Sequence, residues 1–282
     1  MAAVSPASAY YFVKPSVRET LGSGQYYGTS DYVDAGTETL DFKPSFSSYH
    51  SASSSGTYNT YSLDVNYNVA DYTLTLTGGL TPTVNDYNDY SAGGEVAREF
   101  NPGDKGFFKR VDLGGGVLQT IHGQKVTVPA IRAGTFSIPA STGTIHIQQF
   151  DAQGNISVTI PDATLSLNLT KSVYDRDVAR LAVRAASVTK LAGLNQTIQG
   201  FPDNHASLKA ELELWDDVTP YVSYSYTSFK AQEPIAVGYT VGSLFRWGGL
   251  RLDGSYQRFA QRGAADIDYY SLGASYRFEA GE

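Results

Sequence analysis

An apolar residue recurs at every second position over many segments of the chain, and this period of two constrains the fold more than any other feature. Residues 270–278 are the clearest case, since one face carries Tyr270, Leu272, Ala274, Tyr276 and Phe278 while the other carries Ser, Gly and Arg. The same alternation occurs at 61–69, 72–77, 164–170, 206–214, 222–227 and 250–257. Successive side chains of a β-strand point to opposite faces, so the pattern predicts amphipathic strands and an all-β chain.

The composition agrees with strands and turns rather than helices. Charged residues make up only 17% of the 282 residues, whereas Tyr (21) and Gly (28) are abundant. Aromatic residues are enriched in strands, and Gly is common in turns. The net charge of −7 disfavours a nucleic-acid partner, which requires a basic surface. The chain has no cysteine, which excludes a disulfide scaffold, a cysteine zinc site and a thiol nucleophile.

No run of residues reaches the roughly 18 consecutive apolar positions of a transmembrane helix, but a membrane barrel strand needs only about ten alternating residues. Tight turns at 215–217, 247–249 and around Asp175 alternate with longer joins at 192–205, 230–236 and 261–266. Short turns at one end and long loops at the other are typical of outer-membrane barrels. We therefore predict one domain over residues 1–282, a transmembrane antiparallel up-and-down β-barrel of about 14 strands (roughly 12–16).

Some segments depart from this pattern. Residues 85–116 hold a charged, Gly-rich run and the triplet Gly114-Gly115-Gly116, and we expect a long loop there, either external or folded inward as a constriction or gate. Residues 117–162 are predicted to form barrel strands, with a small β subdomain as the alternative. Residues 177–194 fit a helix or a strand, and we prefer a strand because their neighbours are strands. The tight turn at Ala70 and Asp71 falls where counting from the N-terminus predicts an external loop.

Aromatic residues gather at the predicted strand ends. Trp215 and Trp247 lie beside tight turns. The tyrosines near strand ends are Tyr10, Tyr11, Tyr61, Tyr72, Tyr174, Tyr239, Tyr269 and Tyr270. Such rings favour the boundary between membrane and water. They therefore indicate aromatic girdles on a barrel whose apolar face contacts lipid.

The final strand resembles the C-terminal signature of Gram-negative outer-membrane β-barrel proteins, a class that includes the porin-like channels. In that class a last aromatic residue, here Phe278, follows apolar residues at every second position. The resemblance implies a location in the bacterial outer membrane, contact with its lipid, and recognition of the segment from Tyr270 to Phe278 by the barrel-assembly machinery. Residues 279–282 follow the aromatic, whereas chains of this class usually end there.

The N-terminus lacks a basic region followed by an apolar core, and Ala7-Ser8-Ala9 resembles the small-residue end of a cleavage site. We therefore expect an exported chain from which the signal peptide is absent.

The sequence offers little support for catalysis. Its four histidines are His50, His122, His146 and His205, and no two of them have metal-ligand spacing. It has no G-x-S-x-G motif, and its Gly-rich run lacks the Lys-Ser/Thr pair of a phosphate loop. We predict that the chain is not an enzyme and uses no cofactor or metal.

If the apolar residues face lipid, the alternate positions face the lumen. The predicted pore-lining residues are Lys14, Arg18, Lys43, Asp64, Arg180, Arg184, Lys209, Glu211, Glu213, Arg246, Arg251, Asp253 and Arg277, and Asp41 shares their parity. A barrel of about fourteen strands is too wide for side chains to fill, which predicts an outer-membrane pore for passive diffusion of small hydrophilic solutes. The basic majority of the set favours anionic solutes.

Two alternatives remain open. One is an outer-membrane enzyme or adhesin that acts through its long loops on a closed barrel, and the other is a soluble β-rich secreted protein. The sequence identifies no partner protein.

Overall fold

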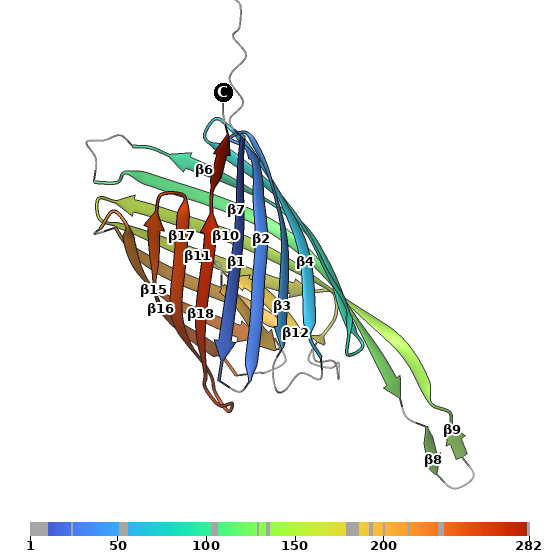
Figure 1. Ribbon diagram of the computed structural model, residues 1–282. Coiled ribbons are helices and arrows are strands. Elements are labelled where there is room, and N and C mark those ends of the chain that lie inside the picture. Colours follow the sequence, from blue (N-terminus) through green and yellow to red (C-terminus); the bar gives the residue numbers. More distant parts are fainter. Residues whose placement is uncertain are drawn as a thin grey trace, which may run out of the picture.

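A computed structural model describes residues 11–23, 25–50, 56–102, 107–128, 130–133, 136–178, 186–191, 194–199, 201–213, 215–230 and 234–280. The described chain is all-β and forms a closed antiparallel barrel of 14 strands, as the sequence predicts (Figure 1). Within these ranges, no helix has the length and apolar character that crossing a membrane requires.

The barrel strands follow one another in chain order, and each pairs with its neighbours in antiparallel register. They are β1 (Tyr11–Gly22), β2 (Tyr26–Thr37), β3 (Leu40–His50), β4 (Tyr58–Val69), β5 (Tyr72–Val84), β6 (Tyr87–Phe100), β7 (Arg110–Val128), β10 (Ser141–Ile160), β11 (Ala163–Tyr174), β14 (Pro202–Leu212), β15 (Val218–Phe229), β16 (Ala236–Trp247), β17 (Leu250–Gln261) and β18 (Ile267–Tyr276). Four short strands form two separate hairpins, β8 (Ile131–Ala133) with β9 (Phe136–Ile138) and β12 (Ala186–Leu191) with β13 (Leu194–Gln199).

The first and last strands close the barrel. Ser16 of β1 lies opposite Ser275 of β18, and this register continues to the partners Gly22 and Tyr269. The short strand β19 (Phe278–Ala280) continues β18 along β1 and places Phe278 opposite Val13. Closure leaves no free sheet edge around the wall, which is the condition for a β-sheet to lie in lipid.

The two ends of the barrel differ in their connections. We call the end with Tyr11 and Ala280 the near end, and its connections are 38–39, 70–71, 101–109, 161–162, 213–217 and 248–249. The opposite, far end carries the longer connections 51–57, 129–140, 175–201, 230–235 and 262–266, together with the short turns 23–25 and 85–86. The predicted separation of short turns from long joins is therefore present, with local exceptions.

The tight turn expected at Ala70 and Asp71 is present, and it lies at the near end because four complete strands precede it. The strand count that placed an external loop there was wrong, and so was the turn assigned around Asp175. Asp175 does not lie in a tight near-end turn, since it begins the long far-end connection 175–201. The turn opposite it along β11 is at residues 161–162.

The long loop predicted at residues 85–116 was also wrong, because β6 and β7 occupy most of that range. Asn85 and Asp86 both have a positive φ, 52° and 63°, as a two-residue type I′ hairpin turn requires. The remaining connection, 101–109, lies at the near end. Residues 85–116 therefore cannot act as the predicted external loop or constriction.

The glycines of this region permit close packing of neighbouring strands on the inner side of the wall. A Cβ atom on Gly93 would lie 2.4 Å from the Val117 carbonyl oxygen, and one on Gly116 would lie 2.6 Å from the Gly94 carbonyl oxygen. Backbone atoms cannot yield as a flexible side chain can, so only glycine fits these positions. The Gly114-Gly115-Gly116 run is thus part of a strand at a crowded place in the barrel wall.

Residues 117–162 lie mostly in two long barrel strands, as predicted. Strands β7 and β10 are 19 and 20 residues long and pair over 19 positions. Their far ends form a ribbon that carries the β8–β9 hairpin beyond the barrel (Figure 1). In the ambiguous segment 177–194, β12 is a strand, but it pairs with β13 and not with the barrel. Residues 179–185 lie outside the described part of the chain.

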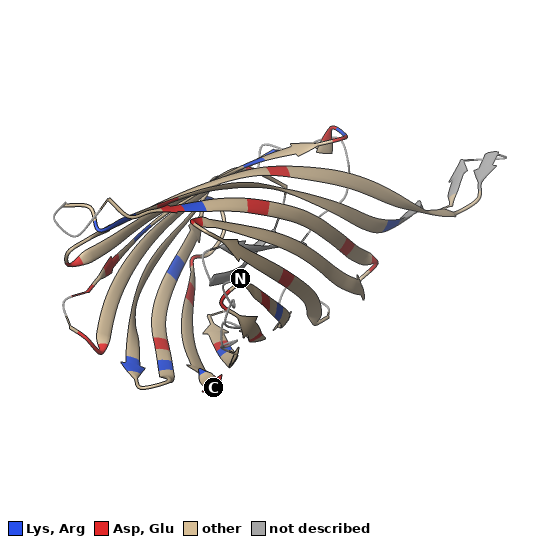
Figure 2. Ribbon diagram, turned by 90° about the horizontal axis from the view of Figure 1, so that it is seen from above, with Lys and Arg blue, Asp and Glu red and all other residues tan. Residues whose placement is uncertain are grey.

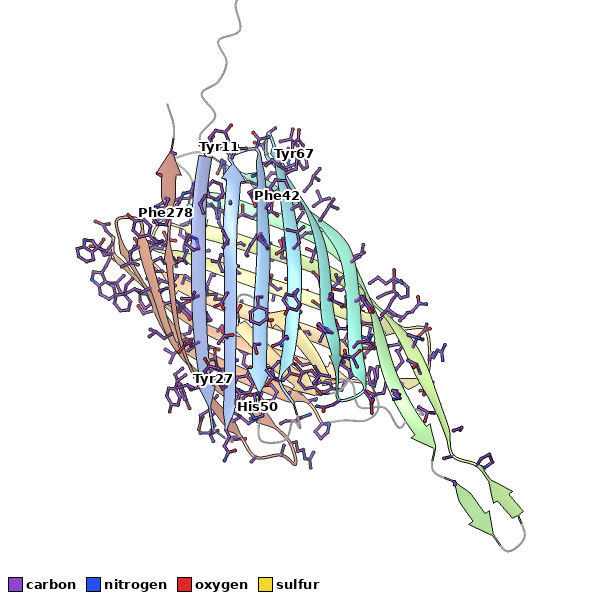
Figure 3. The ribbon with its side chains drawn as sticks, turned by 45° about the vertical axis from the view of Figure 1, so that its right-hand side comes forward. Tyr11, Tyr27, Phe42, His50, Tyr67 and Phe278 are labelled. Carbon is purple, nitrogen blue, oxygen red and sulfur yellow. The ribbon has the colours of Figure 1, made fainter. Side chains whose placement is uncertain are left out.

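Aromatic side chains stand on the outer surface at both ends. Tyr11, Tyr67 and Phe278 mark the near end and Tyr27 the far end in Figure 3. Of the predicted girdle residues, Tyr11, Tyr61, Tyr72, Trp215, Tyr239, Trp247 and Tyr270 are exposed on the outer surface. Two of the predictions were wrong, because Tyr269 packs edge-on against buried Tyr26 and Tyr174 packs against buried Phe201. Tyr10 lies outside the described residues.

We predict that Gly116→Ala destabilises the barrel and that Gly154→Ala does not. The added methyl group collides with the Gly94 carbonyl in the first case, whereas a Cβ on Gly154 meets nothing within 4 Å. We expect the first change to lower the free energy of unfolding by about 1–3 kcal/mol, and the second to alter it by less than about 0.5 kcal/mol. Urea unfolding in lipid vesicles measures both, and equal effects would contradict the crowding at Gly116.

Candidate functional site

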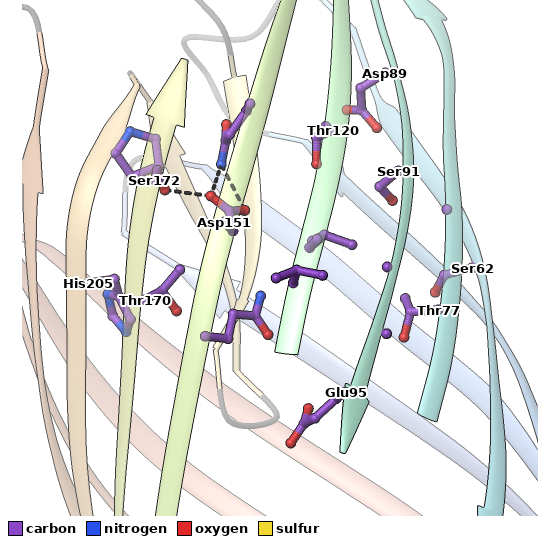
Figure 4. Close-up of a pocket in the computed structure, with 18 of the residues that line it drawn as sticks. Ser62, Thr77, Asp89, Ser91, Glu95, Thr120, Asp151, Thr170, Ser172 and His205 are labelled. Carbon is purple, nitrogen blue, oxygen red and sulfur yellow. Dashed lines mark hydrogen bonds between the residues drawn. The ribbon is translucent and has the colours of Figure 1, made fainter. Parts of the chain in front are cut away.

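The inner face of the barrel contains a cavity of about 360 Å³. Its lining comes from β4, β5, β6, β7, β10, β11, β14 and β15, whose inward-facing positions are mostly Ser, Thr, Asn, Gln and acidic residues (Figure 4). Hydroxyl pairs such as Thr60 with Thr81, 2.9 Å apart, join neighbouring strands along this surface. The cavity is therefore polar, as the alternation of the strands predicts.

Four carboxylates line the cavity, those of Asp64, Asp89, Glu95 and Asp151. Asp64 accepts a hydrogen bond of 2.9 Å from the Thr77 hydroxyl, and Glu95 accepts one from the Asn155 amide. No Lys or Arg is found among the described lining residues, and none of the four carboxylates forms a salt bridge to a described residue. Neutral donors therefore hold these side chains without cancelling their charge.

A buried chain of hydrogen bonds crosses the wall of the cavity. The Tyr87 hydroxyl lies 3.0 Å from Asp89 Oδ2 and 2.8 Å from His122 Nδ1. His122 Nε2 lies 3.0 Å from Gln149 Oε1. The chain ends at Asp151, which accepts from Gln149 Nε2 at 2.8 Å and from the Ser172 hydroxyl at 2.6 Å.

The donors and acceptors of this hydrogen-bond chain limit the His122 protons to two arrangements. Gln149 must donate its amide hydrogens to the Asp151 carboxylate, which directs its Oε1 towards His122 and makes Nε2 a donor. Tyr87 has one hydroxyl hydrogen for two possible acceptors. If Tyr87 donates to Asp89, Nδ1 must also donate and His122 carries a positive charge. If Tyr87 donates to Nδ1, His122 is neutral.

An apolar cluster lies beside this chain inside the barrel. Tyr87, Ile147, Val178 and Phe201 are buried together, with Phe201 edge-on to His122 at a ring separation of 6.5 Å. Val178 and Phe201 stand near the two ends of the far-end connection 175–201. Both ends of this long connection therefore pack against inward-facing residues of the barrel.

A second charged cluster lies on the inner face of β1, β14, β15 and β17. Arg18 of β1 forms an ion pair with Asp253 of β17, and the Tyr221 hydroxyl donates to the same carboxylate at 3.0 Å. Arg18 reaches Asp253 over Gly273 of the intervening strand β18, whose Cβ position lies 3.4 Å from Arg18 Nε. Lys209 contacts the face of the Tyr221 ring and lies 2.9 Å from Glu211.

Other predicted pore residues lie apart from this cluster. Lys43 stands over the Tyr32 ring, Lys14 lies opposite Asp34 in the register, and Asp41 accepts from Asn66. Glu213, Arg246, Arg251 and Arg277 are exposed towards the near end of the barrel. Arg180 and Arg184 lie outside the described residues. Of the predicted set, the structure places Asp64 in the cavity lining, and it joins Arg18 with Asp253 and Lys209 with Glu211.

The sequence prediction missed several inward-facing acids, namely Asp34, Asp89, Glu95, Asp112 and Asp151. On β6 a period of two is present, with Asp89, Ser91 and Glu95 facing in. Small residues such as Ala92 and Gly94 occupy its outer face and hide the pattern. With these additions, acidic residues outnumber basic ones at the described inward positions. Arg180 and Arg184 of the predicted basic majority lie outside these positions. Figure 2 marks the charged positions along the strands.

The described residues contain no serine or threonine hydroxyl that is joined through a histidine to a carboxylate. Ser172 donates to Asp151, whereas His122 contacts Tyr87 and Gln149. His205 contacts Thr227 through Nδ1 at 2.9 Å. No group of three or more metal-ligating side chains occurs in the described ranges. The absence of enzymatic activity stays a prediction.

No family model matches the sequence, and no curated protein matches it. Among solved structures, the NanC porin is 13% identical over 93% of this chain and 98% of its own, with a TM-score of 0.43. OpdK of Pseudomonas aeruginosa, solved with vanillate, is 9% identical over 96% and 99%, with a TM-score of 0.42. OmpT of Vibrio cholerae, expressed in the outer membrane, is 11% identical over 99% of this chain and 100% of its own, with a TM-score of 0.49. These neighbours are bacterial outer-membrane β-barrel proteins, and their likeness to the chain is one of fold.

We predict that Tyr87→Phe destabilises the protein while Tyr90→Phe on the same strand does not. Removal of the Tyr87 hydroxyl leaves Asp89 and His122 without their shared partner, at a cost of about 1–3 kcal/mol. Tyr90 is 53% exposed on the outer face, so the same change there should cost less than about 0.5 kcal/mol. Urea unfolding of the two variants in lipid vesicles checks this difference. A Tyr87→Phe variant as stable as the unaltered protein would show that the buried hydrogen bonds do not stabilise the fold.

Proposed function

We propose that the chain forms a pore in a bacterial outer membrane and passes small hydrophilic solutes by passive diffusion. The observation that carries this proposal is a closed 14-strand barrel with an apolar outer face and a polar cavity inside. A soluble barrel or sandwich has the opposite need, with its apolar side chains inside.

The outer face supports a location in lipid. Leu76, Val117 and Leu272 are each about two-thirds exposed, at 66%, 67% and 68%. Exposure of many large apolar side chains on one continuous surface is unfavourable in water and favourable in a bilayer. The aromatic residues near both ends suit the two membrane boundaries. By the same proposal, the near end with its short turns faces the periplasm.

The charges of the lumen support a pore that acts on its solutes. The acidic residues Asp64, Asp89, Glu95 and Asp151 lie on β4, β6 and β10, whereas the basic residues Lys14, Arg18, Lys43 and Lys209 lie on β1, β3 and β14. Charges of both signs on the inner face set a local field in the bore, and such a field influences which solutes pass. The proposed pore lining includes every charged residue that the sequence predicts to face the lumen.

We further propose that the final strand serves assembly. Tyr270, Leu272 and Tyr276 are exposed on the outer face of β18, and Phe278 continues that face on β19. The barrel-assembly machinery would read this apolar face before the strand pairs with β1. Lipid and small solutes are the other proposed partners.

A second candidate is adhesion at the cell surface. The projecting ribbon of β7 and β10 with the β8–β9 hairpin favours it, because this ribbon extends past the far end of the barrel (Figure 1). Planar-bilayer recordings separate the two functions. A pore gives discrete conductance steps, whereas folded, heat-modifiable protein that gives none would contradict the pore and favour a function of the far-end ribbon and loops.

We predict that Phe201→Ala raises the single-channel conductance, because the Phe201 ring is buried inside the barrel with Tyr87 and beside His122, and its removal leaves more room for solutes there. Phe150→Ala is the matched control, since Phe150 is 46% exposed on the outer face of β10. Its conductance should equal that of the unaltered protein. Unchanged conductance of folded Phe201→Ala would place the rate-limiting constriction elsewhere.

A further inference from the structure

The acidic cavity has no Lys or Arg among its described lining residues, and none of its carboxylates forms an ion pair with a described residue. Lys43 lies opposite Asp64 in the register but stands over the Tyr32 ring instead. Elsewhere on the inner face, Asp253 is paired with Arg18, and Glu211 is paired with Lys209. In the cavity, the only described side chains that can carry positive charge are His122 and His205. A charged His122 would offset one of the four carboxylates, so the cavity keeps a negative charge in either of its protonation states.

The carboxylates do not form a metal site. No cluster of three or more metal-ligating groups exists within the part of the chain that the structure describes. A divalent cation needs several oxygen ligands within about 2.6 Å, and the cavity spreads its carboxylates over β4, β6 and β10 instead. The arrangement suits a larger solute whose donor groups are separated from one another.

His205 provides an independent sign of a ligand. It lines the cavity and is only 4% exposed, and its Nδ1 is occupied by Thr227. Its Nε2 is buried without a hydrogen-bond partner in the described residues. An unpaired buried polar atom costs free energy, and a solute that brings a hydrogen-bond donor into the cavity would relieve this cost when Nε2 accepts.

The neutral part of the lining adds further recognition. Ser62, Thr77, Ser91, Thr120 and Thr170 present hydroxyl groups to the same space (Figure 4). Hydroxyl groups can donate or accept, so they match the hydroxyls of a polyol in any orientation.

We propose that the cavity is a binding site for small organic cations that carry both an ammonium group and several hydroxyl groups, as amino sugars do, and that it makes the pore cation-selective. The inference rests on the proposed pore function. The carboxylates of Asp64, Asp89, Glu95 and Asp151 together attract the ammonium group, which contacts one or another of them, and the hydroxyl groups meet the Ser and Thr side chains. Anions are repelled by the same charges, contrary to the preference that the sequence suggested.

Recordings on the unaltered protein test the selectivity first. Under a KCl gradient, the reversal potential should correspond to a preference for K⁺ over Cl⁻ of about tenfold, the lower end of the enrichment that a charged cleft produces. In liposome swelling, glucosamine should enter faster than glucose of equal size, and glucuronate should enter most slowly. Absence of any conductance would defeat the pore itself, whereas a conducting pore with no preference or with a Cl⁻ preference would defeat only this inference.

The variant Asp64→Asn/Glu95→Gln assigns the selectivity to the cavity. Each amide keeps an oxygen for the Thr77 or Asn155 donor, so the fold should persist, and the heat-dependent gel shift verifies it. We expect the cation preference to fall to about threefold or less, because the field in the cavity weakens with each lost charge. Glucosamine entry should fall towards that of glucose.

Glu99→Gln is the matched control. It removes a carboxylate from the same strand, β6, but close to the near end of the barrel. Glu99 lies 4.0 Å from Arg110 there and does not line the cavity. Its selectivity should equal that of the unaltered protein. Equal loss in the control and in the double variant, or no loss in a folded double variant, would overturn the assignment. If the double variant does not insert, Asp64→Asn and Glu95→Gln are compared singly by the same criterion.

Discussion

Pairing of β1 with β18 and β19 is the contact on which the whole architecture depends. Without it the sheet would have two open edges, and the unpaired amides and carbonyls along them could not enter a bilayer. Closure also brings Arg18 across Gly273 to Asp253. The inner surface at this junction is thus joined by an ion pair as well as by the backbone ladder, and the rest of the wall follows in simple chain order.

Once the wall is closed, parity assigns each side chain to lipid or lumen. The outer face becomes apolar with aromatic residues near both ends, and the inner face becomes mostly polar apart from the apolar cluster around Phe201. The inner charges are not evenly distributed, because β4, β6 and β10 bring uncompensated acids to the cavity while Arg18 and Lys209 are paired elsewhere. The proposed cation preference arises from this uneven distribution, whereas the proposed conduction rests on the closed wall and its polar interior.

The errors in the sequence prediction have a common physical origin. On β6 and β7 the outer positions include Ala92, Gly94 and Gly115, whose small side chains weaken the alternation of polarity. Glycine also serves as a turn residue, so Gly114-Gly115-Gly116 resembled a loop although the run lies in a strand and close packing against the Gly94 carbonyl requires glycine at position 116. Because these strands were not recognised, the inward-facing acids Asp89 and Glu95 were missed. Tyr174 and Tyr269 were misplaced because an aromatic at a strand end can face either side.

The sequence by itself determined an all-β amphipathic barrel of the right size, because side-chain alternation is a local property of each strand. It also determined that the apolar face of the final strand points outward, and it located most of the aromatic girdle residues. Only the tertiary structure decided which strands carry the cavity and that Val178 and Phe201 are anchored inside. It also decided that His122 joins Asp89 to Asp151 through Tyr87 and Gln149. These contacts join strands distant in sequence, and register and closure, which no local pattern encodes, bring them together.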